Sequence, residues 1–122
     1  MAHMKDFRDL KVWQKAHQLV LAVYKVTRSF PGDERFGLTS QLRRSIVSIA
    51  SNISEGCGRS SDRELARFLD ISAGSSSETE YQLLLARDLG YIDQEQHHVL
   101  TTQVNEVRRM LHSFIQKLKA ES

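Results

Sequence analysis

The sequence predicts an all-α protein, an antiparallel up-down-up-down four-helix bundle. Three observations lead to this fold class. Apolar residues recur at spacings of three and four in four separate segments, which is the period of an amphipathic helix. No segment of useful length alternates apolar and polar residues as a strand would. One proline and six glycines among 122 residues leave room for long helices, and short connections make neighbouring helices antiparallel.

The first predicted helix runs from about Asp9 to Ser29 and stops at Pro31 and Gly32. One heptad-like seam of this helix consists of Trp13, Ala16, Val20, Val23, Thr27 and Phe30. A second apolar line, with residues seven apart, consists of Val12, Leu19 and Val26. Because one stripe suffices for the core of a small bundle, the surplus predicts burial against another subunit.

The second predicted helix, from about Leu38 to Glu55, carries two different stripes. The apolar stripe consists of Leu42, Ile46, Ile49 and Ile53. The stripe of small or polar residues consists of Gln41, Ser45, Ser48, Asn52 and Glu55. A helix with both stripes is expected to contact more than one neighbour. Gly56-Cys57-Gly58 is expected to end it, with a glycine in the left-handed conformation.

The third predicted helix opens with a capping box formed by Ser61 and Glu64 and continues to about Leu89. Its centre, residues 72–77, is rich in serine and poor in helix propensity. We favour a close contact between these small residues and the serine stripe of the second helix. A local bend, caused by hydroxyls that bond to earlier carbonyls, is the second alternative. A ligand pocket lined by hydroxyls is the third.

Gly90 ends the third helix, and Asp93 is expected to cap a fourth helix with Gln96 in the reciprocal position. The apolar stripe of this helix repeats at spacings of four and three. It consists of Leu100, Val104, Val107, Leu111, Phe114 and Leu118.

The chain length predicts a single domain over residues 5–122. Residues 1–4 look like the remnant of an expression tag, and a disordered start is expected there. The single cysteine excludes an intramolecular disulfide and suits a reducing cytoplasm. No apolar run approaches the ~20 residues of a membrane span, and no secretory signal opens the sequence. We therefore expect a cytoplasmic protein that does not enter membranes.

The charges are unevenly distributed, although the net charge is only +2. Residues 1–61 contain ten Lys and Arg against five Asp and Glu, whereas residues 62–122 contain seven against ten. This asymmetry predicts either a basic surface for an anionic partner or complementary faces within an assembly. Ordinary solvated helix faces are the alternative.

Four segments taken together resemble the 23S ribosomal RNA intervening-sequence family of four-helix-bundle proteins. They are FRDLKVWQKA (7–16), QLRRSIVSIASNISEG (41–56), RELARFLDISAGSSSETEYQLLLA (63–86) and LGYI (89–92). The resemblance covers nearly the whole chain from Phe7, in the same order. The chain departs from the family pattern at Ser76, Ser77 and Thr79, and at Ala50, where many relatives have proline.

This resemblance implies a homo-oligomer, commonly five bundles around a pore. The family is also similar to the accessory protein of diversity-generating retroelements, a pentameric barrel that binds nucleic acid and a reverse transcriptase. Most relatives have no established biochemical role, so the resemblance bears more on fold and assembly than on function.

Rows of basic residues are the candidates for nucleic-acid contact, because they can follow a phosphate backbone and an oligomer would repeat their field. The candidates are Lys11, Lys15, Arg43, Arg44, Arg59, Arg63 and Arg67, of which the last three are expected to share one face of the third helix. The alternative, favoured by the modest net charge, is pairing in solution with Glu64, Asp70 or Glu106. No stacking platform or reader motif is recognised. The resemblance gives the two interpretations equal weight.

The subunit interface is expected on the first helix and on the small-residue faces of the second and third helices. The candidate residues are Val12, Leu19, Val26, Ser48, Asn52, Gly74, Ser75 and Glu78.

Catalysis and metal binding are not expected. Di-metal bundles use paired Glu-x-x-His motifs, and only Glu95 and His98 have this spacing. Cys57 follows a helix C-terminus, where the helix dipole does not stabilise a thiolate. We therefore predict no catalytic residue, no metal ligand and no cofactor.

The predicted function is that of a non-enzymatic, homo-oligomeric accessory protein, expected to be a pentamer, that binds RNA or DNA. A reverse transcriptase or another protein is a further expected partner. The alternatives are a structural self-assembling adaptor that does not bind nucleic acid, and a metal-dependent enzyme.

Overall fold

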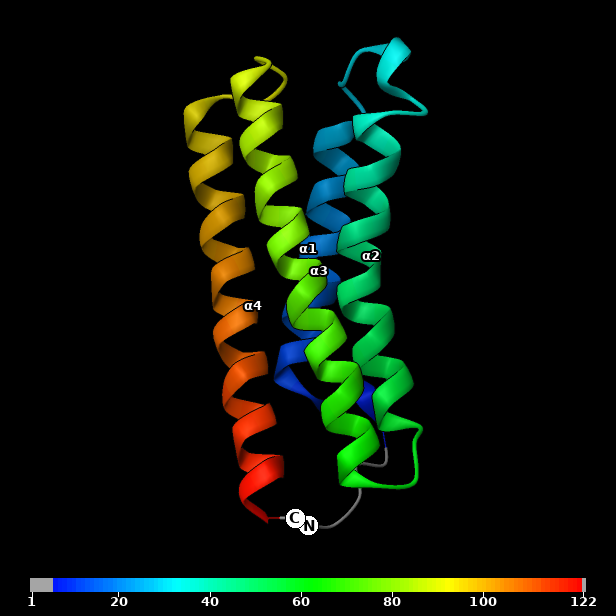
Figure 1. Ribbon diagram of the computed structural model, residues 1–122. Coiled ribbons are helices and arrows are strands. Elements are labelled where there is room, and N and C mark those ends of the chain that lie inside the picture. Colours follow the sequence, from blue (N-terminus) through cyan, green and yellow to red (C-terminus); the bar gives the residue numbers. More distant parts are fainter. Residues whose placement is uncertain (1–5, 122) are drawn as a thin grey trace.

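The computed structural model describes residues 6–121, which form four long α-helices and two short 3₁₀ helices (Figure 1). The 3₁₀ helices are η1 (Phe7–Asp9) and η2 (Gly32–Glu34). The α-helices are α1 (Lys11–Thr27), α2 (Leu38–Cys57), α3 (Asp62–Asp88) and α4 (Gln94–Glu121). No strand occurs within residues 6–121, and the predicted all-α four-helix bundle is confirmed. The predicted tag remnant at residues 1–4 lies outside the described residues.

Each helix packs against two others, and together the four contacts enclose one core. α1 and α3 each contact both α2 and α4, whereas the diagonal pairs do not pack within the described range. α2 and α3 are antiparallel. Ser45 bonds to Gln82, whereas the later residue Ile49 accepts through its carbonyl from the earlier residue Ser72. Figure 1 shows the same alternation of direction for the other successive helices.

The core is built from one apolar side of each helix. The α2 stripe is fully buried as predicted, at Leu42, Ile46, Ile49 and Ile53. The buried stripe of α4 consists of Leu100, Val104, Val107, Leu111, Ile115 and Leu118. Phe114, which the pattern predicted in this stripe, is only partly buried, and Ile115 takes its place. Burial of each large side chain contributes roughly 1.5–3 kcal/mol, which the entropy of ordering the chain largely offsets.

The predicted seam of α1 lies largely in the core, since Ala16, Val23, Thr27 and Phe30 are buried, but the core also extends onto the second predicted line. Val12 and Leu19 are 4% and 2% exposed and belong to the core of the bundle, so they are unavailable for the predicted subunit contact. Trp13 and Val20, predicted to face the core, are only partly buried at its edge. The buried side of α1 therefore takes residues from both predicted lines, which are neighbours around the helix. The periodicity alone could not show how far around the helix the core extends.

The serine-rich centre of α3 makes the close contact with α2 that the sequence favoured. The Ser72 hydroxyl donates to the Ile49 carbonyl at 2.8 Å. The hydroxyls of Ser48 and Ser75 are 2.8 Å apart. Thr79 donates to Ser45 at 2.8 Å, and Ser45 donates to the Gln82 side-chain carbonyl at 2.6 Å. These small side chains satisfy one another inside the bundle, which lets the two helix backbones approach.

Gly56 has a different role from the one predicted. It lies inside α2 and is buried, and neither Gly56 nor Gly58 has a positive φ. A Cβ atom at position 56 would lie 2.9 Å from both Leu65 Cδ1 and Phe68 Cβ. Gly56 is therefore required by the close approach of α3, not by a left-handed turn. Among the described residues only Gly90, after α3, has the left-handed conformation, with φ 81°.

Cys57 is also placed differently, because it is the last residue of α2 and is buried, whereas the sequence placed it after the end of that helix. Burial is the main cause that raises the pKa of its thiol, and the charge of Asp6 adds to it. A raised pKa suppresses the thiolate at neutral pH.

Both predicted N-caps are confirmed, and the reciprocal bond of a full capping box is present at Asp93 and Gln96. Ser61 Oγ accepts from the Glu64 backbone N–H at 3.2 Å at the start of α3. At the start of α4, Asp93 Oδ1 accepts from the Gln96 N–H at 2.7 Å, and Gln96 Oε1 accepts from the Asp93 N–H at 2.9 Å. Such caps satisfy N–H groups that have no partner within the helix.

Over residues 6–121, no helix is both long and apolar enough to cross a bilayer.

The two helical glycines Gly56 and Gly74 provide a matched pair of variants. Gly56→Ala is expected to destabilise the protein by about 1–2 kcal/mol. Overpacking costs ~1–3 kcal/mol, and the higher helix propensity of alanine offsets at most about 1 kcal/mol of this. A Cβ atom at position 74 would have no neighbouring atom within 4 Å, so Gly74→Ala is expected to stabilise by about 0.5–1 kcal/mol. Chemical denaturation of both variants measures the difference. Equal stability of the two would contradict the close approach at Gly56.

Candidate nucleic-acid interface

A shallow groove of about 580 Å³ lies where α1 ends and α2 begins, at the upper end of the bundle in Figure 1. Three arginines line it, and no carboxylate does. We call it the basic groove, and its lining residues are Tyr24, Arg35, Phe36, Thr39, Ser40, Arg43, Arg44 and Val47. Of the predicted basic candidates, the fold brings only Arg43 and Arg44 here, and it adds Arg35.

Arg43 joins α2 to the end of α1. Its Nε donates to Thr27 Oγ1 at 2.8 Å, and one terminal nitrogen donates to the Tyr24 carbonyl at 3.4 Å. Its guanidinium also lies 4.6 Å from the centre of the Tyr24 ring. The last carbonyls of a helix carry partial negative charge, so a cation is stabilised at this position. Arg43 therefore has a structural role as well as a charge at the groove.

Arg35 and Arg44 are exposed, and neither forms an ion pair with a carboxylate in the described part of the chain. Arg35 lies 5.4 Å from the centre of the Phe36 ring. Together with Arg43 they place three positively charged side chains along the lining of the groove.

Phe36 is the functional candidate that the sequence reasoning missed. It follows η2 in the connection to α2 and is 86% exposed, more than the other exposed large apolar residues of residues 6–121. The sequence signal for it was weak, since a single phenylalanine between Arg35 and Gly37 belongs to no helical stripe. An exposed ring beside arginines is the type of surface on which bases stack.

The nearby carboxylate of Glu34 is used to build the loop. Glu34 Oε1 accepts from the Leu38 N–H at 3.1 Å, and Oε2 accepts from the Tyr91 hydroxyl at 2.8 Å. These two hydrogen bonds, the backbone one first, hold the pKa of Glu34 below its usual value. A Cβ at Gly37 would lie 2.6 Å from Glu34 Oε1, so glycine leaves room for this cap.

The other predicted basic residues lie away from the basic groove. Lys15 pairs with Glu106 at 3.4 Å, and Lys11 is exposed at the start of α1. Arg59 precedes α3 and is not part of it, so it cannot share a helix face with Arg63 and Arg67 as predicted.

Arg59 and Arg67 nevertheless meet at one aromatic ring. They lie 4.8 and 4.6 Å from the centre of the Phe68 ring, and they pair with Glu55 at 2.8 Å and Glu64 at 3.4 Å. These pairs agree with the alternative that surface arginines are balanced by nearby carboxylates.

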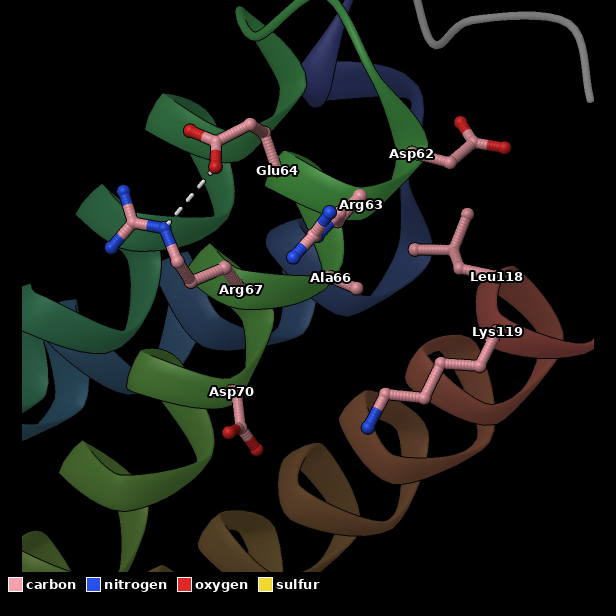
Figure 2. A pocket seen from close by; sticks show the side chains of 8 residues that line it. All are labelled: Asp62, Arg63, Glu64, Ala66, Arg67, Asp70, Leu118 and Lys119. Carbon is pink, nitrogen blue, oxygen red and sulfur yellow. Dashed lines mark hydrogen bonds and ion pairs between the residues drawn. The ribbon is translucent and has the colours of Figure 1, made fainter. Parts of the chain in front are cut away.

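Arg63 lies in a second pocket, of about 610 Å³, between the start of α3 and the end of α4. Figure 2 shows acidic and basic side chains interleaved around it. Its charged lining residues are Asp62, Glu64, Asp70, Arg63, Arg67 and Lys119. Because acids and bases are equal in number there, the pocket has no net attraction for a polyanion.

The predicted interface residues of α2 and α3 fall into two groups, those that bond within the bundle and those that are exposed. Ser48 and Ser75 bond to each other, and the Asn52 amide donates to the Ser48 carbonyl at 2.8 Å. Gly74 and Glu78 are exposed, and Val26 is half-buried. The large apolar residues that remain exposed are Leu21, Tyr24, Phe36, Ile71, Tyr81, Leu84, Leu89 and Val99.

Within residues 6–121 no three histidine, cysteine, aspartate or glutamate side chains are grouped as metal ligands would be. Glu95 and His98 are exposed in the first turns of α4.

The adjacent residues Arg43 and Arg44 are expected to contribute differently to the stability of the protein. Arg43→Met is expected to destabilise the protein by about 1 kcal/mol, because it removes two hydrogen bonds and a cation from the end of α1. Arg44→Met is expected to stay within ~0.5 kcal/mol of the original chain, because Arg44 is exposed. Urea denaturation of both variants gives the comparison. Equal losses would argue against the capping role of Arg43.

Comparison with known proteins agrees with this architecture. A search of curated proteins gives no match. The crystal structure of a protein of unknown function from Bacteroides thetaiotaomicron, a member of the S23 ribosomal protein family, has a similar fold. The TM-score is 0.80 and the identity 27%, over 85% of this chain and 97% of that chain. The profile of the 23S rRNA-intervening sequence proteins matches residues 8–113. This chain therefore belongs to the 23S rRNA-intervening sequence protein family.

Proposed function

We propose that this protein is a non-enzymatic, self-assembling protein that binds nucleic acid through the basic groove. The observation that carries the proposal is the charge of the groove: three guanidinium groups line it without a carboxylate. The second pocket, by contrast, contains as many acidic as basic side chains. A polyanion is attracted to the first surface and not to the second.

RNA is the first ligand to test, because the family description refers to an intervening sequence of 23S rRNA. Duplex and single-stranded DNA are the comparison ligands. Phosphate contacts by arginine are independent of sequence and are weakened by salt, since binding releases counterions.

Self-assembly is proposed from the exposed apolar residues. Leu21 is 57% exposed on α1, and Tyr81 is 61% exposed on α3. Because α1 and α3 are diagonal helices that do not contact each other, their outer faces lie on different sides of the bundle. Two separate surfaces of this kind suit a head-to-tail contact, which forms a ring when the rotation between copies closes. The family resemblance makes five copies the expected number.

A ring would also support nucleic-acid binding. Each copy would add one basic groove, and linked grooves on a single strand bind more tightly than one groove alone. This reasoning connects the apolar faces of α1 and α3 with the charge at the start of α2.

Charge reversal tests the binding site. The double variant Arg35→Glu with Arg44→Glu is expected to abolish gel-shift binding of structured RNA at low salt, because it replaces two phosphate contacts by repulsion. The matched control is Arg109→Glu with Lys117→Glu, which changes the net charge equally on the exposed side of α4. Control and original chain should bind alike. If both double variants bind as the original chain does, the basic groove is not the site.

Light scattering tests the assembly. The original chain is expected to have a mass several times 14.0 kDa. Tyr81→Glu is expected to reduce this mass, because it places a charge on an exposed apolar surface of α3, whereas Thr102→Glu on α4 should not. A mass of one chain at micromolar concentration would refute self-assembly through these faces.

If no nucleic acid binds although the ring forms, the second candidate function applies. The protein would then be a structural adaptor, and the exposed apolar residues favour that alternative.

A further inference from the structure

We propose that the basic groove selects single-stranded nucleic acid by stacking an unpaired base on Phe36 while Arg35 and Arg44 hold the adjacent phosphates. This inference rests on the proposed function and adds to it the strandedness of the ligand and the residue that recognises it. The inference is based on one observation: the exposed Phe36 ring lines the same groove as three arginines.

Phe36 has no packing role that explains its position. It is 86% exposed, and it is not among the residues that form or border the hydrophobic core. An apolar ring in water is unfavourable by itself, so a ligand that covers the ring gains free energy from its burial. The ring lies in a short connection beside the groove, where a strand bound to the arginines would pass it.

The arginines provide the second half of the site. Arg35 and Arg44 form no ion pair with a described carboxylate, so binding a phosphate does not require them to leave another partner. Arg43, although engaged with Thr27 and Tyr24, contributes its charge. Thr39 also lines the groove, and its buried hydroxyl has no hydrogen-bond partner in the described structure.

Phe36 is better suited to a base than Tyr24 is. The Arg43 guanidinium lies 4.6 Å from the Tyr24 ring centre, and Tyr24 is only 38% exposed. The Phe36 ring is more open, and Arg35 lies farther from its centre, at 5.4 Å. The site thus offers a largely exposed ring next to two arginines that form no ion pair within residues 6–121.

An accessible ring selects single strands over duplexes for a geometrical reason. In a duplex the faces of the bases are covered by their stacked neighbours, so only phosphates and groove edges can be reached. In a single strand or a loop the base faces are available, and aromatic side chains stack on them with little dependence on sequence. An acidic peptide could contact the arginines but would gain nothing specific from Phe36.

The experiment uses fluorescence anisotropy with the full chain and three labelled ligands. They are an oligothymidine of about ten nucleotides, an abasic strand of the same length, and polyglutamate of the same charge. Phe36→Ala is expected to weaken oligothymidine binding by roughly 5- to 100-fold, and to leave binding of the abasic strand and the salt dependence unchanged. Phe36→Trp should retain binding, and its fluorescence should be quenched by the bases.

Two controls separate stacking from charge and from general aromatic effects. Tyr81→Ala removes another exposed aromatic ring, which lies on α3 outside the groove, and should not affect oligothymidine binding. Arg44→Gln should weaken binding of both strands and reduce the salt slope by about 0.7, the value for one contact to a single strand.

The possible failures are distinguishable. Equal affinity of Phe36→Ala and the original chain for oligothymidine would overturn base stacking and leave the proposed function intact. Polyglutamate binding as tight as oligothymidine binding would overturn nucleic-acid selection in favour of an acidic protein partner. Absence of binding to every ligand at low salt would overturn the proposed function itself.

Discussion

The close packing of α2 on α3 is the constraint on which the rest of the structure depends. It requires glycine at position 56, where a Cβ would collide with Leu65 and Phe68. It also requires the hydroxyls of Ser45, Ser72 and Thr79, which are buried and satisfied by bonds between the helices. Small side chains bring the backbones together, and their hydrogen bonds prevent the cost of buried, unpaired polar atoms. With this pair in place, α1 and α4 cover the remaining apolar sides.

This constraint decides which surfaces are left for function. The hydroxyls of Ser45, Ser48, Ser72 and Ser75 bond between α2 and α3, so they are used within the bundle. The apolar residues that stay exposed lie elsewhere, with Leu21 on α1 and Tyr81 on α3 as the most exposed on their helices. Apolar side chains therefore do remain exposed on the bundle, but they are not Val12 and Leu19, which the sequence analysis named.

The arginines at the two ends of the bundle differ in whether they pair with carboxylates. Around the α2–α3 connection Arg59 and Arg67 pair with carboxylates and share the Phe68 ring. At the start of α2 the carboxylate of Glu34 instead caps the helix and bonds to Tyr91. The groove arginines are consequently left without this acidic partner. The modest net charge of +2 hides this local difference, because it averages over both ends.

The sequence by itself determined the four helices, both N-caps, the α2 stripe and the serine contact, because these depend on residues close together on one helix or on a strong pattern. Only the tertiary structure decided how far the core extends around α1, since its apolar residues cover more than one side of the helix. It also decided the role of Gly56 and the burial of Cys57, which depend on the distance to α3. The same is true of the basic groove. Arg35, Phe36 and Arg44 line one groove with Tyr24 only because α1 and α2 pack together, and no spacing along one helix predicts this.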